Sequence, residues 1–221
     1  MKKLLTIAAC ALILSGCQAT AEKAAAPAGK PVGVTSSLMS VDVMHNGASV
    51  TISRNADNKN TVNPSFALTS RPCPPFCIQP MKLSEGVETI GETEMLAYLE
   101  KMTAGDDSIL VIDSRTPDWA ERGMIPGAVN IPWTALNTAK GADPISIGDI
   151  FTEQFGAEEF DGLWKFGGAK TLVMYCNGMW CGQSPTNIKA LLDFGYPADK
   201  IKWYRGGMQD WENLGLTTVK P

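Results

Sequence analysis

Short apolar segments of strand type alternate with helix-forming segments from residue 86 to the C-terminus, and this alternation limits the fold more than any other feature of the chain. The expected strands cover residues 87–90, 109–112, 129–131, 170–175 and 201–204. The expected helices cover residues 92–102, 117–122, 147–155 and 185–194, with a last helical turn through Trp211. Because strands that alternate with helices pair in parallel, we predict an α/β domain over residues 86–221 with helices on both faces of the sheet. Reactive groups of such a domain lie at the carboxyl ends of its strands.

One of these strand ends carries a cysteine. The strand at 170–175 leads into Cys176, a glycine-containing loop, and then Ser184 and Pro185, which are typical of an N-cap and a first helical residue. Backbone N–H groups in a tight loop and at a helix start favour an anionic sulfur, so the pKa of a cysteine there falls below its usual value. We therefore expect a reactive thiolate at Cys176. The alternative is an inert thiol packed in the core.

The loop after Cys176 supplies the rest of the predicted site. Its backbone amides from Asn177 to Gln183 are expected to form an anion cradle. The predicted substrate-binding residues are Asn177, Gly178, Met179, Trp180, Gly182, Gln183 and Ser184. Trp180 either forms a wall of a pocket or simply packs. The loop has no arginine or lysine to hold an oxyanion, and its second thiol, Cys181, is a candidate resolving thiol.

Three separated stretches resemble the rhodanese family. The first is VIDSR at 111–115 with GMIPGAVNIP at 123–132, the second is the cysteine loop, and the third is RGGMQDW at 205–211. The resemblance covers roughly residues 86 to 219 and implies a rhodanese-like sheet. It also implies that Cys176 accepts a sulfane sulfur as a persulfide and passes it to a nucleophile, which is covalent catalysis in two steps.

Two features depart from the family pattern. Met124 stands where the family signature has a histidine, which we expect to affect packing more than chemistry. The cysteine loop is also longer than in typical sulfurtransferases, so its cradle must have a different shape. With Cys181 the loop is similar to that of a group of exported rhodanese-like proteins that carry two cysteines there. Asp113 and Arg115 are expected to support the site as a structural ion pair rather than to act in catalysis.

Three functions remain open from the sequence. The first is a sulfurtransferase that carries sulfane sulfur on Cys176, with a small sulfane-sulfur donor and a thiol acceptor as partners. The second is a thiol–disulfide redox protein that uses Cys176 and Cys181 with a partner protein. The third is a non-catalytic sulfur- or metal-binding module whose two loop cysteines form a disulfide. We predict no cofactor and no metal, because a chain with one histidine lacks the material for a Cys/His zinc site or a His-based triad.

The first 16 residues resemble a bacterial lipoprotein signal peptide. Lys2 and Lys3 precede an apolar run over residues 4–14 that is too short to span a bilayer. The following LSGC at 14–17 is similar to the lipobox, which implies that Cys17 becomes a lipid-modified N-terminus. Gln18 follows it, and a residue other than aspartate there implies sorting to the periplasmic side of the outer membrane. The alternative is an ordinary signal peptide with an incidental cysteine.

Two further segments are expected between the anchor and the α/β domain. Residues 17–38 are predicted to be a lipidated flexible tether, because they are rich in Ala, Lys, Pro, Gly and Ser and have no apolar period. Residues 39–85 are predicted to be an extension that begins with a small β-hairpin turning at Asn46-Gly47, with His45 in solvent at its tip. The chain is acidic, with a formal net charge of −4 and no basic run, so nucleic acid is not an expected partner.

The extension also contains a proline-dense segment with two cysteines. Residues 71–80 hold too many prolines for a helix or a central strand. We expect a disulfide between Cys73 and Cys77, because disulfides persist in an oxidising compartment. The alternative is a Cu(I) site that uses both sulfurs and a nearby methionine such as Met81.

Overall fold

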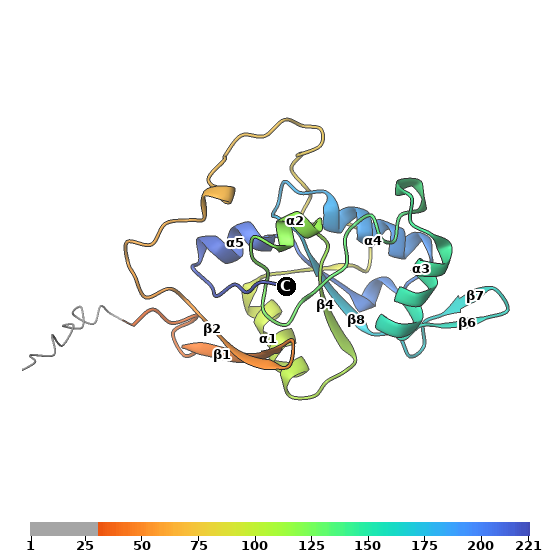
Figure 1. Cartoon of the computed structure of the whole chain (residues 1–221), viewed down its shortest axis with the longest axis horizontal. Helices are drawn as coiled ribbons and strands as arrows, with labels where there is room; N and C mark the ends of the chain where they lie inside the picture. The colour runs from red at the N-terminus through yellow and green to blue at the C-terminus, as the bar shows by residue number, and fades with distance from the viewer. Residues whose placement is uncertain (1–30) are drawn as a thin grey trace, which may run out of the picture.

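The computed structural model describes residues 31–221, which fold around one parallel five-stranded sheet (Figure 1). The strand order is β3-β9-β8-β4-β5, and every neighbouring pair is parallel. Helices cover both faces, and a separate antiparallel hairpin precedes the sheet. The predicted α/β fold with an N-terminal hairpin is confirmed.

The bounds of the elements follow the alternation of the sequence closely. The strands of the sheet are β3 (Glu88–Ile90), β4 (Ile109–Asp113), β5 (Val129–Asn130), β8 (Thr171–Tyr175) and β9 (Ile201–Tyr204). The helices are α1 (Glu92–Thr103), α2 (Pro117–Ala120), α3 (Pro144–Asp149), α4 (Gln183–Asp193) and α5 (Gly207–Asn213). The two hairpins are β1 (Ser40–His45) with β2 (Ala48–Ser53), and β6 (Glu158–Phe160) with β7 (Leu163–Lys165).

The two faces of the sheet bury separate apolar clusters. On one face α1, α5 and the first hairpin pack against β4 and β8, and Leu99, Val173 and Trp211 lie in this cluster. On the other face α3 and α4 pack against the same strands around Phe151 and Leu191. The strands can be apolar on both sides because both faces are covered. Both faces of the sheet are thus covered, while Glu88 and Val129 on its two edge strands are exposed.

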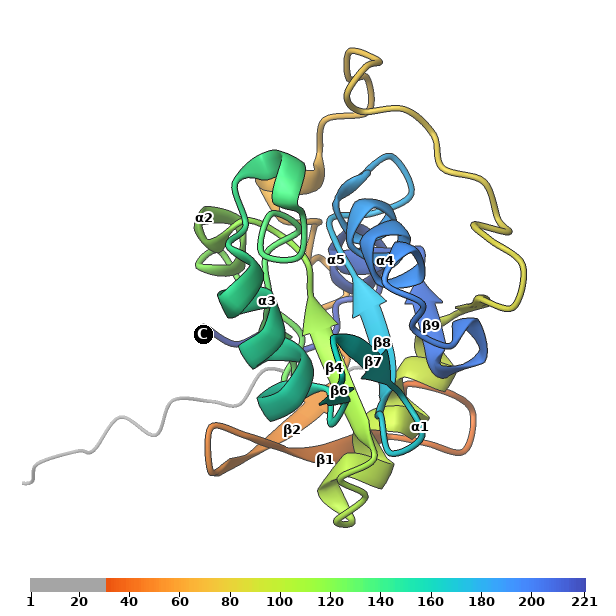
Figure 2. The same ribbon diagram turned by 90° about the vertical axis from the view of Figure 1, so that its right-hand side faces the viewer.

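The carboxyl ends of the strands form one edge of the molecule. Figure 2 shows the arrowheads of β4, β8 and β9 pointing to the same side, where a gold-coloured segment of the extension passes over them. The loops that follow β4, β5 and β8 therefore meet at this edge, as expected for a parallel sheet.

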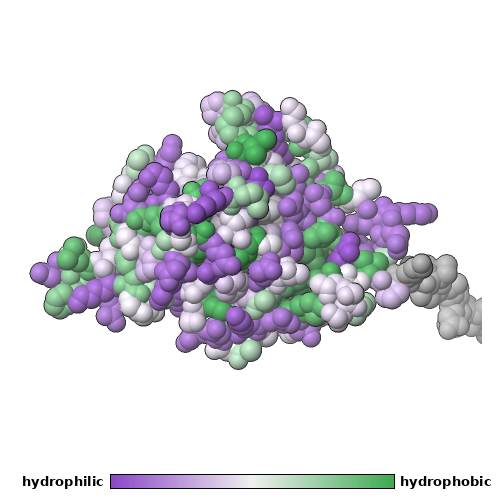
Figure 3. Space-filling model, turned by 180° about the vertical axis from the view of Figure 1, so that it is seen from behind, coloured by the Kyte–Doolittle hydropathy of each residue, from purple (hydrophilic) through white to green (hydrophobic). Residues whose placement is uncertain are grey.

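Three local features of the structure differ from the prediction. The helix expected at 147–155 begins earlier, because Asp143 caps it by accepting from the Ser146 amide, and α3 then passes into a π-helical turn, Ile150–Gln154. The β6–β7 hairpin was not predicted. It projects from the end of the molecule with Phe160 and Leu163 63% and 71% exposed, and Figure 3 shows apolar colour at this projecting end. Helix α4 begins at Gln183, with Gly182 as the N-cap residue, so Ser184 lies inside the first turn and is not the cap.

The first hairpin forms at the predicted turn but docks more tightly than expected. Asn46 and Gly47 both have positive φ, at 49° and 79°, which a two-residue turn of this type requires. His45 is half-buried instead of solvated. Its Nδ1 accepts from the Gly127 amide at 3.2 Å, and its Nε2 lies 3.1 Å from the Lys220 carbonyl oxygen. The histidine therefore joins the hairpin to the α/β domain.

The predicted N-terminal signal, residues 1–16, and Cys17 lie outside the described residues. Of the predicted tether at 17–38, residues 31–38 are described, and Val34 and Leu38 pack partly buried against the cluster that contains α1. The folded part thus begins before residue 39. Among the helices within residues 31–221, none is long and apolar enough to cross a membrane.

Candidate active site

Cys176 directly follows β8 and lies at the loop edge of the sheet, with its side chain only 2% exposed. The start of α5 packs beneath it, because Met208 and Gln209 donate their backbone N–H groups to the carbonyl oxygens of Cys176 and Asn177, at 3.0 and 2.9 Å. Gly207 makes this approach possible. Its φ is +56°, and a Cβ atom there would lie 2.3 Å from the Cys176 carbonyl oxygen.

Hydrogen bonds to Cys176 stabilise its thiolate. Burial acts to raise the pKa of the thiol, but donors from the Cys181 and Ser184 side chains and from the Ser184 and Gly178 amides outweigh it and lower the pKa to about 7. Ser184 Oγ lies 3.0 Å from Cys176 Sγ. The Trp203 indole in turn donates to Ser184 Oγ at 3.0 Å, which directs the serine proton to the sulfur. A substantial fraction of the Cys176 sulfur is therefore anionic at neutral pH.

Cys181 is a free, buried thiol beside Cys176. Its hydrogen bond to Cys176, together with burial, raises the pKa of Cys181 well above its ordinary value. Cys176 is therefore the first of the two thiols to lose its proton, and Cys181 stays protonated beside it. Cys181 Sγ also lies 3.6 Å from Gln183 Oε1, a second acceptor for its proton. The structure thus contains a dithiol with unequal members.

The anion cradle differs from the prediction in one respect. The amides of Gly178 and Ser184, at the two ends of the loop, face the Cys176 sulfur. The Cys181 amide instead donates to the Gly178 carbonyl oxygen at 2.9 Å and closes a turn. Around Cys176 the cradle is therefore formed by the Gly178 and Ser184 amides and the Ser184 hydroxyl, whereas the Asn177 and Gln183 amides are directed at the Cys181 sulfur.

A segment of the N-terminal extension covers the cysteine loop. We call residues 71–79 the roof segment. The Gln79 amide donates to the Met179 carbonyl oxygen at 2.8 Å, and Arg205 donates to the Gln79 carbonyl oxygen at 2.8 Å. Within it Cys73 and Cys77 form a disulfide. The two sulfurs are therefore bonded to each other and are not available as metal ligands, which overturns the alternative Cu(I) site with Met81.

Trp180 fixes the roof segment and does not line the pocket. Its half-buried indole lies edge-on to Phe76, with ring centroids 5.7 Å apart, and the Arg71 guanidinium stacks 3.8 Å from its centroid. The indole N–H donates to Oε1 of Gln209 on α5. Trp180 thus packs against the roof segment and α5. The stacked Arg71 also brings a cation to a loop that has none of its own.

A pocket of about 330 Å³ opens beside the loop, next to Cys181. Its apolar walls are the rings of Phe76, Trp119 and Trp133, with Pro75. Its polar lining comes from the residues Asn177, Cys181, Gly182, Gln183 and Thr186. The loops after β4, β5 and β8 and the roof segment thus all contribute to one cavity at the strand ends.

The family model of the rhodanese-like domain matches residues 95–214, which are more than half of the chain. The chain belongs to the rhodanese-like family. A helix-turn-helix transcriptional regulator of Mycobacterium tuberculosis is 27% identical over 118 residues, which are 53% of this chain and 40% of that protein. The chain thus spans less than half the length of this curated relative.

Two solved structures of sulfurtransferases resemble this rhodanese-like chain. A human single-domain sulfurtransferase is 22% identical with a TM-score of 0.38, and the match covers 57% of this chain and 95% of that one. The thiosulfate sulfurtransferase of Pseudomonas aeruginosa is 19% identical with a TM-score of 0.37, over 61% of this chain and 20% of that one.

Asp113 and Arg115 form a buried ion pair beneath the cysteine loop. Their side chains are 0% and 1% exposed, and the guanidinium donates through Nε and Nη2 to the carboxylate, at 2.5 to 3.0 Å. The Tyr175 hydroxyl donates to the same carboxylate at 3.2 Å, and Arg115 also donates to the Gly123 carbonyl oxygen at 2.6 Å. The pair thus braces the end of β4, the role expected from the sequence.

Several residues of this rhodanese-like site were missed from the sequence. Trp119 and Trp133 follow β4 and β5, so their positions after predicted strands could have revealed them. Arg71 and Phe76 carried no such signal, because their contacts with the loop span about a hundred residues of chain. Among residues 31–221 no three His, Cys, Asp or Glu side chains form a cluster that could hold a metal ion.

Proposed function

We propose that this protein transfers sulfane sulfur and carries it as a persulfide on Cys176. The observation that supports this most is the Cys176 sulfur with a pKa of about 7, held by two amides and the Ser184 hydroxyl at the end of a parallel strand. A thiolate is the nucleophilic form of cysteine, so no separate base is required. Membership of the rhodanese-like family supports the same reaction class.

Besides the sulfur donor and the acceptor thiolate, the two half-reactions need only Cys176 and the amides around it. The Cys176 thiolate attacks the sulfane sulfur of a donor, the donor S–S bond breaks, and the remainder leaves with the electron pair. The amides of Gly178 and Ser184 that held the thiolate then face the persulfide anion. An acceptor thiolate attacks the outer sulfur, and Cys176 leaves again as a thiolate.

Intact mass spectrometry of the reduced protein after incubation with a polysulfide tests this proposal. We expect a gain of one sulfur that maps to Cys176, and no gain in Cys176→Ser. Cys181→Ser serves as the matched control, because it removes a thiol from the same loop and should keep the gain. Sulfur retained in Cys176→Ser, or none in the wild type, would remove the sulfurtransferase assignment.

Thiol–disulfide exchange is the second candidate, because Cys176 and Cys181 are both free and hydrogen-bonded to each other. Under exchange chemistry the wild type cycles to a Cys176–Cys181 disulfide, and Cys181→Ser traps mixed disulfides with partner proteins. Under sulfur transfer the same variant forms the persulfide and traps no partner. Non-reducing electrophoresis of Cys181→Ser from cells separates the two candidates.

We further propose that the chain is anchored by a lipid on Cys17 at the periplasmic side of the outer membrane. The sequence at residues 14–17 supports this, and so does the Cys73–Cys77 disulfide, which belongs to an oxidising compartment. Mass spectrometry of the N-terminal peptide from membranes should find Cys17 acylated. An unmodified peptide that begins elsewhere would refute the anchor.

A further inference from the structure

The pocket beside Cys181 has an uncharged lining. Its walls are formed mainly by the rings of Phe76, Trp119 and Trp133, and none of its lining residues is an acid, a lysine or an arginine. Flat apolar walls of this kind favour the body of an organic molecule over a small hydrated anion. The pocket is therefore uncharged and mainly apolar, whereas the cradle around Cys176 presents hydrogen-bond donors to a negatively charged sulfur.

A cationic side chain lies over each of the three rings. Arg122 is 4.3 Å from the Trp119 ring centroid, Lys140 is 5.6 Å from that of Trp133, and Arg71 is 5.9 Å from that of Phe76. Arg122 and Lys140 are exposed, and neither is among the residues that line the pocket. The side chain of Asp118, 3.7 Å from Arg122, partly offsets one of these charges. The cations over the rings thus favour an anionic group on a ligand whose body lies between the rings.

Two buried polar atoms of the pocket residues lack partners. Asn177 is 3% exposed, and its Oδ1 accepts no hydrogen bond. The indole N–H of Trp133 donates none. A buried polar atom without a partner is unfavourable, so a ligand that supplies the missing bond gains affinity. The residues that line the pocket thus hold one acceptor and one donor without a partner in the protein.

We propose that this pocket binds the acceptor of the proposed sulfur transfer, and that the acceptor is a small organic thiol with a flat apolar body and a carboxylate. The inference rests on the proposed function. The body lies between the three rings, and the carboxylate lies toward Arg122 and Lys140. The acceptor thiolate attacks the outer sulfur of the Cys176 persulfide, the S–S bond breaks, Cys176 leaves as a thiolate, and the transferred sulfur departs on the acceptor as its persulfide.

The location of Cys176 supports an acceptor at this place. Cys176 is 2% exposed and does not line the pocket, whereas its neighbour Cys181 does. A persulfide places its outer sulfur about 2 Å beyond the cysteine sulfur. Transfer to a molecule in the pocket requires this outer sulfur to lie on the side of Cys181, which lines the pocket.

Calorimetry with para-(methylthio)benzoate tests binding without chemistry, because this thioether cannot accept sulfur. We expect Lys140→Gln and Arg122→Gln each to weaken its binding to the full chain about threefold, and the double variant about tenfold. Asp118→Asn should strengthen binding about twofold, because Arg122 loses its counter-charge. Trp133→Phe keeps the ring but removes the donor, and should weaken binding about fivefold.

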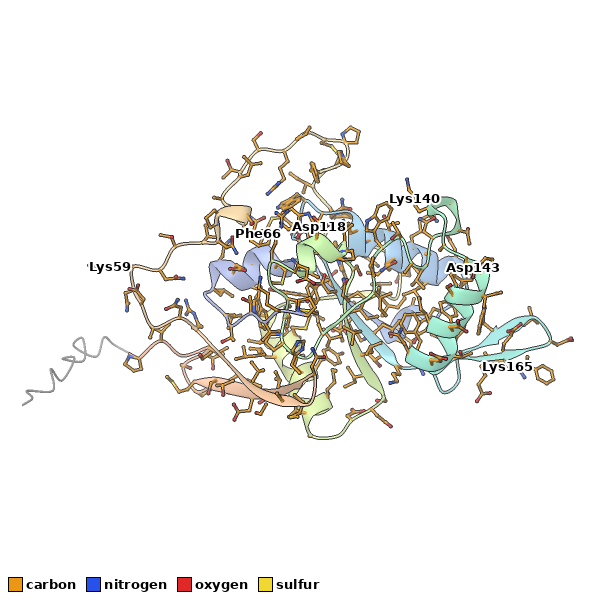
Figure 4. All side chains as sticks on the ribbon, viewed as in Figure 1. Lys59, Phe66, Asp118, Lys140, Asp143 and Lys165 are labelled. Atoms are coloured by element: carbon orange, nitrogen blue, oxygen red, sulfur yellow. A yellow bond between two sulfur atoms is a disulfide. The ribbon has the colours of Figure 1, made fainter. Side chains whose placement is uncertain are left out.

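Lys165→Gln is the matched control. Lys165 also lies over an aromatic ring, 3.8 Å from the centroid of Phe160, but it belongs to the projecting β6–β7 hairpin. Figure 4 labels Asp118 at α2, Lys140 at the short helix Thr138–Lys140, and Lys165 at the β6–β7 hairpin. This variant should bind the probe as the wild type does. Thioanisole, which has the same body without the carboxylate, should bind the charge variants and the wild type equally.

The outcomes separate this inference from the proposed function. If the Cys176 persulfide forms from polysulfide but the probe does not bind, or binds all charge variants equally, the acceptor pocket is refuted and sulfur transfer stands. If the probe binds as expected but no persulfide forms, the sulfur-transfer function falls. Support for both requires that para-mercaptobenzoate removes sulfur from the Cys176 persulfide, more slowly in the Lys140→Gln and Arg122→Gln double variant.

Discussion

At the scale of single residues, reactivity depends on how one thiol is solvated by protein groups. Cys176 and Cys181 are equally buried, at 2% and 3% exposure, yet the pKa of Cys176 falls and that of Cys181 rises. Backbone amides face both sulfurs, so the difference lies in the side chains: Cys176 accepts from Cys181 and from the Ser184 hydroxyl, whereas Cys181 donates to Cys176. Burial alone would have raised both pKa values.

Ser184→Ala should raise the pKa of Cys176, because its thiolate loses the hydroxyl donor at 3.0 Å. The rate of iodoacetamide alkylation at Cys176, mapped by mass spectrometry across pH, should have its midpoint at about 7 in the wild type and at higher pH in the variant. Ser146→Ala removes a hydroxyl from the start of α3, remote from the cysteines, and should leave the midpoint unchanged. An unchanged midpoint in Ser184→Ala would contradict the account.

At the scale of elements, the cysteine loop is shaped by the start of α5 as much as by its own sequence. The tight approach at Gly207 lets α5 bond the carbonyl oxygens of Cys176 and Asn177. Gln209 of the same helix accepts from the Trp180 indole. The loop is thus held from below, which keeps the Gly178 amide directed at the sulfur.

Gly207→Ala should destabilise the protein by about 3 kcal/mol or more, because the added Cβ would lie 2.3 Å from the Cys176 carbonyl oxygen. Gly162→Ala is the control, since Gly162 also has a positive φ, +74°, but no atom within 4 Å of an added Cβ. The control should cost only about 1 kcal/mol from backbone strain. Urea denaturation measures both, and equal losses would show that the contact with Cys176 is unimportant.

The sequence predicts elements well where the chemistry is local and poorly where it is not. The strands ending at Asp113, Tyr175 and Tyr204 were found because their apolar runs are continuous. The start of α3 was placed too late because residues 144–146 have no apolar period, and it is marked instead by the Asp143 cap and by Pro144 in the first turn. Ser184 was read as an N-cap, whereas its hydroxyl is used by Cys176 and Trp203, a contact that no local pattern shows.

At the scale of the whole molecule, the N-terminal extension completes the site. The roof segment contributes Pro75 and Phe76 to the pocket, and Arg71 stacks on the loop tryptophan. The disulfide between Cys73 and Cys77 was expected from the sequence, but its place above the cysteine loop was not, because only the tertiary fold brings the two segments together. The extension therefore serves as part of the site rather than as a separate module.

Replacing both Cys73 and Cys77 by serine should loosen the roof segment without unfolding the domain. The bridge closes a loop of only a few residues, so its loss should cost about 2 kcal/mol, and the two apolar clusters of the sheet remain intact. Hydrogen exchange should rise at the Gln79 amide and in the cysteine loop, and far less in β4 and β8. Global unfolding of the double variant would instead show that the roof segment braces the core.

The central claim is that Cys176 carries the sulfur between donor and acceptor, and a pulse–chase with isotopically labelled sulfane sulfur tests it most directly. Protein loaded with labelled polysulfide is separated from the donor and mixed with an acceptor thiol, and mass spectrometry follows both species in a single turnover. The account predicts that label leaves the Cys176 peptide at the rate at which the acceptor persulfide appears, and that Cys181→Ser carries label in the same way. Label that reaches the acceptor without residing on Cys176, or that stays on Cys176 while the acceptor is consumed, would contradict it.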